Sequence, residues 1–105
     1  MNAVRVSITA FVDDDFPGWV ACELTDADGV LHQFVEKVPV VSNEDLRQNS
    51  SFPRDGAIAC KVNSNWIDDL GRSLSKIGTS QPWDIESKAG ITDFVVHSSN
   101  IQSTE

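Results

Sequence analysis

The feature that most constrains the fold is the tetrapeptide Asp26-Ala27-Asp28-Gly29, which separates two segments rich in β-forming residues. Its first carboxylate can accept backbone N–H bonds, and its glycine can adopt the positive φ that a tight turn requires. A β-hairpin is therefore predicted over residues 17–41, and the turn sets its register. With Asp26 opposite Val30, the facing pairs on one side of the ribbon are Leu24–His32, Cys22–Phe34 and Val20–Glu36.

The two sides of this hairpin differ in polarity. The side with Cys22, Leu24 and Phe34 is predicted to face the core. The other side carries Trp19 and Val35 among polar residues, so we expect it to be partly covered, as in a small barrel or roll.

A second turn of the same form occurs at Asp68-Asp69-Leu70-Gly71. By the same argument it pairs Asp68 with Arg72, Ile67 with Ser73 and Trp66 with Leu74. The strands that precede the two turns, residues 20–24 and 58–62, have similar sequences and suggest two equivalent hairpins with inward-facing cysteines. Convergence of short β-sequences explains the similarity equally well.

The remaining elements follow from alternation and from turn residues. Period-2 alternation predicts strands over residues 4–12, 57–65 and 91–97. The first strand ends at Asp13-Asp14-Asp15, after which Phe16-Pro17-Gly18-Trp19 fits a type II turn. Pro39 should end the third strand. A short helix is predicted to begin at Ser42 as N-cap, and residues 79–90 are predicted to form an ordered loop pinned by Trp83.

These elements predict an all-β fold, a single small barrel or roll of about six antiparallel strands with one short helical connection. Their order also allows an OB-like barrel. The predicted domain covers residues 1–98, and residues 99–105 are predicted to be a flexible C-terminal tail.

Composition limits the function. The 105 residues carry a formal charge of -8, which disfavours nucleic-acid backbones and anionic membranes and favours a basic protein partner. Acidity that serves solubility alone is the simpler alternative. The N-terminus alternates like a strand rather than a signal peptide, and no apolar stretch is long enough to span a membrane. We therefore expect a cytoplasmic protein with reduced cysteines. An unpaired edge strand near Pro39 or Ile91 could either be protected or pair with a second copy to form a homo-oligomer.

Motifs for catalysis or cofactors are weak. The cysteines and histidines, Cys22, His32, Cys60 and His97, lack the close pair spacing of structural zinc ligands, so we predict no metal site and no cofactor. Calcium at Asp13–Asp15 or at Asp26-x-Asp28-Gly29 is disfavoured because too few oxygen ligands are present. The sequence has no nucleophile elbow, phosphate-binding glycine loop or metalloprotease motif, and hence no predicted catalytic residue.

Aromatic and acidic residues provide the candidate binding site. An exposed aromatic group beside carboxylates can anchor a basic protein, so the predicted partner-binding residues combine both kinds of side chain. They are Trp19, Trp83, Phe16, Asp13, Asp14 and Asp15. At least two of the three tryptophans are nevertheless expected to pack in the core.

About half of the chain carries a resemblance. The pattern from Trp19 to Pro39, with Cys22, Glu23, Asp26 and Gly29, and the later Pro53-x-x-Gly56-x-Ile58-Ala59-Cys60 resemble a family of small uncharacterised bacterial proteins. The resemblance implies a compact bacterial domain and transfers no activity.

The favoured hypothesis is thus a non-enzymatic protein-binding module, acidic and of immunity or inhibitor type. One alternative is a small enzyme or metal-binding protein that uses its cysteines and histidines. Another is a single-stranded nucleic-acid-binding barrel, which would need a basic face around Lys61, Arg72 and Lys76.

Overall fold

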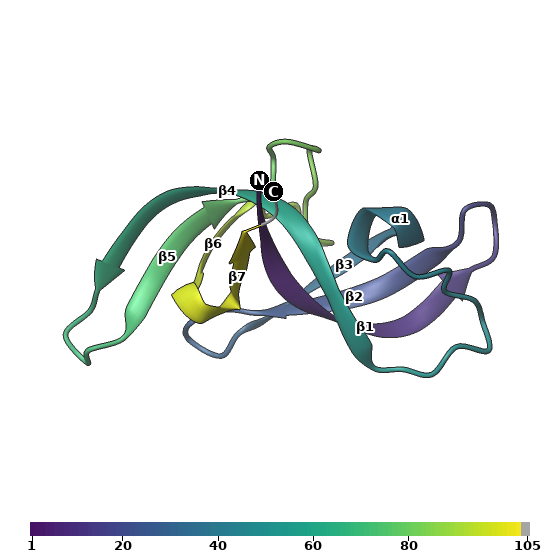
Figure 1. Ribbon diagram of the computed structural model, residues 1–105, viewed down its shortest axis with the longest axis horizontal. Coiled ribbons are helices and arrows are strands. Elements are labelled where there is room, and N and C mark those ends of the chain that lie inside the picture. The colour runs from purple at the N-terminus through teal and green to yellow at the C-terminus, as the bar shows by residue number, and fades with distance from the viewer. Residues whose placement is uncertain (104–105) are drawn as a thin grey trace.

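The computed structural model describes residues 1–103 and consists mainly of one curled antiparallel sheet (Figure 1). The strand order is β3-β2-β1-β4-β5-β6, and β7 pairs with β1 beside this path. The all-β prediction of a small barrel or roll is confirmed. In chain order the elements are β1 (Asn2–Asp13), β2 (Trp19–Thr25), β3 (Leu31–Lys37), the helical turn α1 (Val38–Val41), β4 (Arg54–Ile67), β5 (Ser73–Gly78), β6 (Asp93–His97), the 3-10 turn η1 (Ser98–Asn100) and β7 (Ile101–Ser103).

Strand β1 is the central strand, because it pairs with β2, β4 and β7. Its residues Val4, Val6 and Ile8 are buried, as their alternation predicts. Two register shifts against β2 lie beyond Ile8. They change which side chains face inward, so Phe11 packs against the core whereas Val12 is exposed, contrary to the simple alternation.

Both hairpin registers agree with the predictions from the turns. In β2–β3, Leu24 faces His32 and Cys22 faces Phe34. In β4–β5, Trp66 faces Leu74, and Asp68 N donates to Arg72 O over 3.0 Å. On the predicted core side of the first hairpin, Val20, Cys22, Leu24 and Phe34 are buried, and Cys60 of β4 is buried as well. Local hydrogen bonds at each turn therefore suffice to set strand pairing over several residues.

The two ends of the strand order, β3 and β6, are joined by single hydrogen bonds rather than by a ladder. Ala27 N donates to Val95 O over 2.8 Å, and Lys88 N donates to Gln33 O over 2.7 Å. The Phe94 ring lies between the two ends, with its centroid 4.8 Å from that of His32 and 5.8 Å from that of Phe34. These contacts close the sheet around the hydrophobic core.

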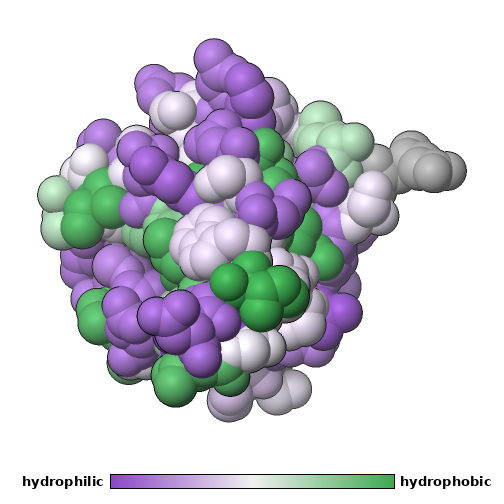
Figure 2. Space-filling view, turned by 90° about the vertical axis from the view of Figure 1, so that its left-hand side faces the viewer, coloured by the Kyte–Doolittle hydropathy of each residue, from purple (hydrophilic) through white to green (hydrophobic). Residues whose placement is uncertain are grey.

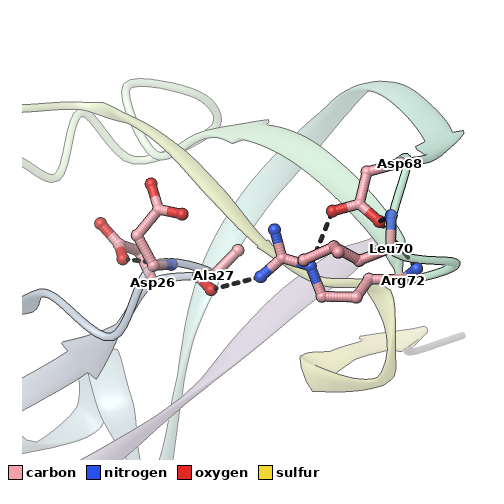
Figure 3. Close-up of polar contacts among 6 residues, drawn as sticks. Asp26, Ala27, Asp68, Leu70 and Arg72 are labelled. Carbon is pink, nitrogen blue, oxygen red and sulfur yellow. Dashed lines mark hydrogen bonds and ion pairs between the residues drawn. The ribbon is translucent and has the colours of Figure 1, made fainter.

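The outer half of the β4–β5 hairpin, residues 61–78, is called here the β4–β5 arm. Arg72 holds it against the β2–β3 turn, because its Nη1 donates to Ala27 O over 3.0 Å while its Nε contacts Asp68 Oδ2 at 2.7 Å (Figure 3). The backbone N–H of Arg72 also donates to Asp68, and these bonds lower the pKa of the Asp68 carboxyl. The two similar turns are thus brought together in space.

The short helix and the first turn differ from the predictions. The helical turn is α1, which contains Pro39, whereas Ser42 accepts a hydrogen bond from Glu44 N without starting a helix. Proline fits this position because it lies in the first turn of a helix, where its missing N–H is not needed. The β1–β2 turn is closed one residue early, by Gly18 N donating to Asp15 O over 2.7 Å.

The loop after β5 is held by other residues than predicted. Thr79 is buried and its Oγ1 donates to Ile85 O over 2.6 Å, while Ile85 itself packs in the core. Trp83 is 51% exposed and does not pin the loop. A buried threonine that satisfies loop carbonyl groups does this instead.

The predicted flexible tail at 99–105 is not a tail over the part that the structure describes. Residues Ile101–Ser103 form β7, and Ser103 pairs with Asn2, which places the two ends of the described chain side by side (Figure 1). Residues 104–105 lie outside the described residues. Pairing with the central strand, together with Ile101 packed against the core, explains why this segment is ordered.

A substitution at Gly56 tests the packing between β1 and β4. A Cβ atom at this position would lie 2.7 Å from Ile8 Cδ1 and 2.9 Å from Val41 O, and a backbone oxygen cannot move aside. We expect Gly56→Ala to lower the free energy of unfolding by about 1–3 kcal/mol, the usual range for overpacking. Urea titration followed by tryptophan fluorescence measures this.

The control is Ala57→Gly, at the next position of β4, which adds no atom. If Gly56→Ala unfolds at the same urea concentration as the wild type, the close approach of these strands is wrong.

Candidate partner-binding site

The four consecutive residues Asp13 to Phe16 form the tip of the β1–β2 hairpin at one end of the molecule (Figure 1). Phe16 is 97% exposed, and the three aspartates are all exposed. The structure therefore places four of the six predicted partner-binding residues side by side on the surface.

The base of this hairpin tip is tightly packed. Gly18 is buried at a φ of 94°, and a Cβ atom there would lie 3.2 Å from the Phe11 ring and 3.4 Å from a Val38 methyl group. Gly18 O also accepts a hydrogen bond from Val38 N over 2.9 Å. Phe16 is thus presented from a held backbone, so little conformational entropy remains to be lost there on binding.

A pocket of about 520 Å³ lies between this tip and the connection that follows α1. We call it the Phe16 pocket. Leu46 is buried and anchors the connection, and Arg47 N donates to Ser50 Oγ over 2.9 Å. The pocket combines apolar walls with polar residues at its edge, and it is lined by Phe11, Asp14, Phe16, Pro17, Gly18, Asp45, Leu46, Arg47, Gln48 and Asn49.

Trp83 lies in a different hollow, which we call the Trp83 groove. This groove has a volume of about 550 Å³. It is lined by residues 39–44, which precede the segment that lines the Phe16 pocket, and by residues of β1 and β4. Small side chains form its floor, and Trp83 stands at its wall. It is lined by Met1, Ala3, Pro39, Val40, Val41, Ser42, Asn43, Glu44, Asp55, Gly56, Ala57, Ala59, Trp83 and Gln102.

Trp19 does not belong to either hollow. It is half-buried, and Lys37 Nζ lies 5.6 Å from its ring centroid in a cation–π arrangement. None of the three tryptophans is buried, so the expectation that two of them pack in the core is wrong. Aliphatic residues and two phenylalanines fill the core instead.

The hairpin tip carries an excess of negative charge. Arg47 pairs with Asp45 at 2.9 Å, and Arg54 pairs with Glu44 at 2.6 Å, so each guanidinium near the connection is matched by one carboxylate. Within residues 1–103, Asp13, Asp14 and Asp15 form no ion pair. Three uncompensated carboxylates therefore lie together immediately before Phe16 in the chain.

The three aspartates also form the single group in the described chain whose oxygens are close enough to hold a metal ion, within 4.8 Å of one another. Asp13 Oδ1 already accepts the backbone N–H of Asp15 over 2.8 Å. Three exposed side-chain oxygens are fewer than the six to eight oxygens that calcium takes. Over the same residues, the cysteines and histidines do not gather into a metal-binding group.

The cysteines have the environment of core residues. Burial, with the nearby charge of Glu36, raises the pKa of the Cys22 thiol to about 12, and burial raises the pKa of Cys60 to about 11. His32 Nε2 contacts Asp26 Oδ2 at 2.8 Å instead of a thiol. This arrangement disfavours a thiolate nucleophile, because the reactive form is the anion.

Sequence reasoning missed the walls of the Phe16 pocket. Leu46 is an isolated apolar residue in a polar segment, which was the available signal for an anchored loop. The proximity of residues 45–49 to the β1–β2 turn depends on tertiary packing and has no counterpart in the sequence pattern.

No protein-family model, curated protein or solved structure matches this chain. No helix within the described residues is long and apolar enough to cross a membrane. Function is therefore argued from the site itself.

The raised thiol pKa values predict slow reaction with a disulfide reagent. At pH 8 we expect both cysteines of the native protein to react with Ellman's reagent at least about 100-fold more slowly than in denaturing urea, because each unit of pKa lowers the thiolate fraction tenfold. The rate should rise with pH. Stability should fall above pH 9, where the unfolded thiols ionise and the buried ones do not.

The urea-unfolded protein is the internal control for reagent activity. One thiol that reacts equally fast in both states would contradict the burial of that cysteine.

Proposed function

We propose that the protein is a non-enzymatic module that binds a basic protein, in the manner of an immunity protein or inhibitor. The observation that carries the proposal is Phe16, a large apolar side chain that is 97% exposed and that directly follows a cluster of three unpaired carboxylates. An aromatic anchor beside a cluster of like charge suits a partner that offers an apolar pocket with Lys or Arg next to it.

The net charge of -8 supports the same partner chemistry. Uncompensated carboxylates at an exposed tip attract a basic surface over a distance of about 10 Å at 0.1 M salt, and so accelerate encounter. Phe16 then supplies the short-range contact. The Phe16 pocket next to it can accept a side chain from the partner, with Asp14 and Asp45 at its edge.

The Trp83 groove extends this surface. Its lining contains two carboxylates, Glu44 and Asp55, and no lysine or arginine. Glu44 is neutralised by Arg54, whereas Asp55 forms no ion pair with any residue of the described range. An extended basic segment of the partner that crosses the connection between the two hollows would meet one unpaired carboxylate in each, Asp14 and Asp55, because Asp45 and Glu44 are paired with arginines.

The alternatives have less support. A Cys/His enzyme or metal site lacks an accessible thiol, and the histidines do not gather with the cysteines. Nucleic-acid binding needs a free basic face, but Arg72 is engaged by Asp68 and Ala27. We place the protein in the cytoplasm, where two free cysteines and an acidic surface are ordinary features.

The test starts from affinity capture on the tagged protein with lysate of its own source, followed by measurement with the purified partner. Phe16→Ser should weaken binding at least tenfold, which is about 1.4 kcal/mol and typical of an interface anchor. Replacing Asp13, Asp14 and Asp15 by Asn should slow association and reduce its dependence on salt. Isothermal titration and stopped-flow fluorescence measure these effects.

The matched control is Leu31→Ser, an exposed apolar residue on β3 that lies outside both hollows. Trp83→Ser shows whether the groove takes part. The proposal fails if the captured proteins are retained equally by the wild type and by the Phe16 and aspartate variants.

A further inference from the structure

The outer part of β4 has one free side. As far as Cys60, β4 pairs with β1. From Lys61 to Ile67 it pairs with β5 alone, and within residues 1–103 no strand lies along its other side. Figure 1 shows the arm extending to the left of the molecule with β4 along its outer margin.

The hydrogen-bond pattern shows which groups point outward from this edge. Asp68 N donates to Arg72 O, so this pair is hydrogen-bonded, and successive pairs of an antiparallel ladder alternate. Trp66 and Ser64 then direct their N–H and C=O groups toward β5. Asn65 and Ile67 direct theirs away from β5, toward the free side.

This edge lacks the usual protection against pairing. Residues 63–67, Asn-Ser-Asn-Trp-Ile, contain no charged residue and no proline, which are the common devices for blocking an edge strand. The one irregularity, a register shift between Val62 and Ser64, lies at the inner end of the arm. The edges of β3 and β6 each accept one backbone hydrogen bond from another segment, at Gln33 O and Val95 O.

The outer end of the arm exposes three large apolar side chains. Trp66 is 39% exposed, Ile67 69% and Leu70 79%. Trp66 and Ile67 are consecutive in β4 and therefore lie on opposite faces of the strand, so apolar surface is present on both sides of the free edge. Figure 2 looks onto this end of the molecule and shows hydrophobic residues at the centre of the face as well as at its margin.

The distribution of charge along the chain favours a second copy of the arm as the partner. The arm contains three basic residues, Lys61, Arg72 and Lys76, and two acidic ones, Asp68 and Asp69, so its net charge is +1. The rest of the chain has five basic and fourteen acidic residues, a net charge of -9. A second arm can therefore approach this arm without the repulsion that separates the two chains elsewhere.

We propose that the protein forms a homodimer through antiparallel pairing of two β4 edges about a two-fold axis at Asn65. This register pairs the outward groups of Asn65 with those of Asn65 in the second copy, and it places Ile67 opposite Asn63, the residue at the register shift of that copy. It brings Lys61 of each chain to the Asp68–Asp69 turn of the other. The result is a continuous sheet in the order β5-β4-β4-β5.

Two hydrogen bonds fix the position and shape of the β4–β5 arm. Arg72 ties it to the β2–β3 turn (Figure 3), and Ser75 Oγ, which is buried, donates to Asn65 Oδ1 over 2.5 Å. The inference does not rest on the proposed function, since the hairpin tip with Phe16 lies at the opposite end of the molecule. If both hold, the dimer presents two acidic tips and gains avidity for a repeated partner.

Sedimentation velocity on the wild-type protein is the first test. We expect the mass to rise from 11.5 kDa toward twice that value as the concentration increases to about 0.5 mM, since a short paired edge gives an interface at the small end of the known range. A protein that stays at 11.5 kDa at this concentration overturns the proposal.

Cross-linking tests the register. In Asn65→Cys, hydrogen-bonded antiparallel positions would place the two Cα atoms about 5.5 Å apart, within reach of a disulfide. Under mild oxidation we expect a covalent dimer from this variant and none from the control Leu31→Cys. Equal cross-linking of both variants, or of neither, overturns this arrangement; the buried Cys22 and Cys60 do not compete.

Charge reversal tests the contact between Lys61 and the opposite turn. Lys61→Glu should raise the dimer dissociation constant about fivefold, and so should Asp69→Lys, because each introduces two like-charged contacts. The double variant should return it to the wild-type value. A double variant that is weaker than either single one contradicts the antiparallel arrangement.

Discussion

The structure depends on the pairing of β1 with three other strands. β2, β4 and β7 all form ladders with this one strand. The position of β1 therefore sets the positions of the β2–β3 hairpin, the β4–β5 hairpin and the C-terminal strand. The close approach at Gly56, where Ile8 and Val41 leave no room for a Cβ atom, lets α1 pack over the crossing of β1 and β4. Gly56 and Val41 both line the Trp83 groove, so this contact forms part of its wall.

A chain organised in this way has two ends of different chemistry. The β1–β2 tip carries Phe16 among unpaired carboxylates, whereas the β4–β5 arm is nearly neutral and has an uncharged edge. The core between them is closed by Phe94 and by two backbone hydrogen bonds, so both ends project from one body. In the proposed function and the proposed dimer, these two ends are used separately, so the two kinds of contact would not compete for one surface.

Much of the fold could be predicted because its signals are local. The carboxylates Asp26 and Asp68 each accept hydrogen bonds from N–H groups within four residues, so the sequence spacing is enough to predict both registers. The alternation of Val4, Val6 and Ile8 is equally direct. Prediction failed where two local signals pointed to different helix positions. Ser42 suits a helix N-cap, but the helical turn forms earlier, around Pro39, and ends at Ser42.

The candidate site could be predicted only in part. Asp13 to Phe16 are adjacent in the sequence, and a polar turn places them on the surface by itself. The separation of Trp83 and Trp19 from them required the positions of residues 39–49 and of Lys37. The exposure of a tryptophan side chain depends on which residues pack against it, and the periodicity of the sequence does not indicate those residues.

The sequence by itself determined the all-β class, the two hairpin registers and the inward position of both cysteines, since each depends on hydrogen bonds or alternation over a few residues. Only the tertiary structure decided that the two similar turns meet through Arg72 and Ala27, 45 positions apart, and that residues 101–103 form a strand with Ile101 packed against the core. It also decided that β4 extends beyond its partner β1 and leaves an open edge. These features arise from contacts between distant segments, whose free energy depends on shape and burial in the assembled fold.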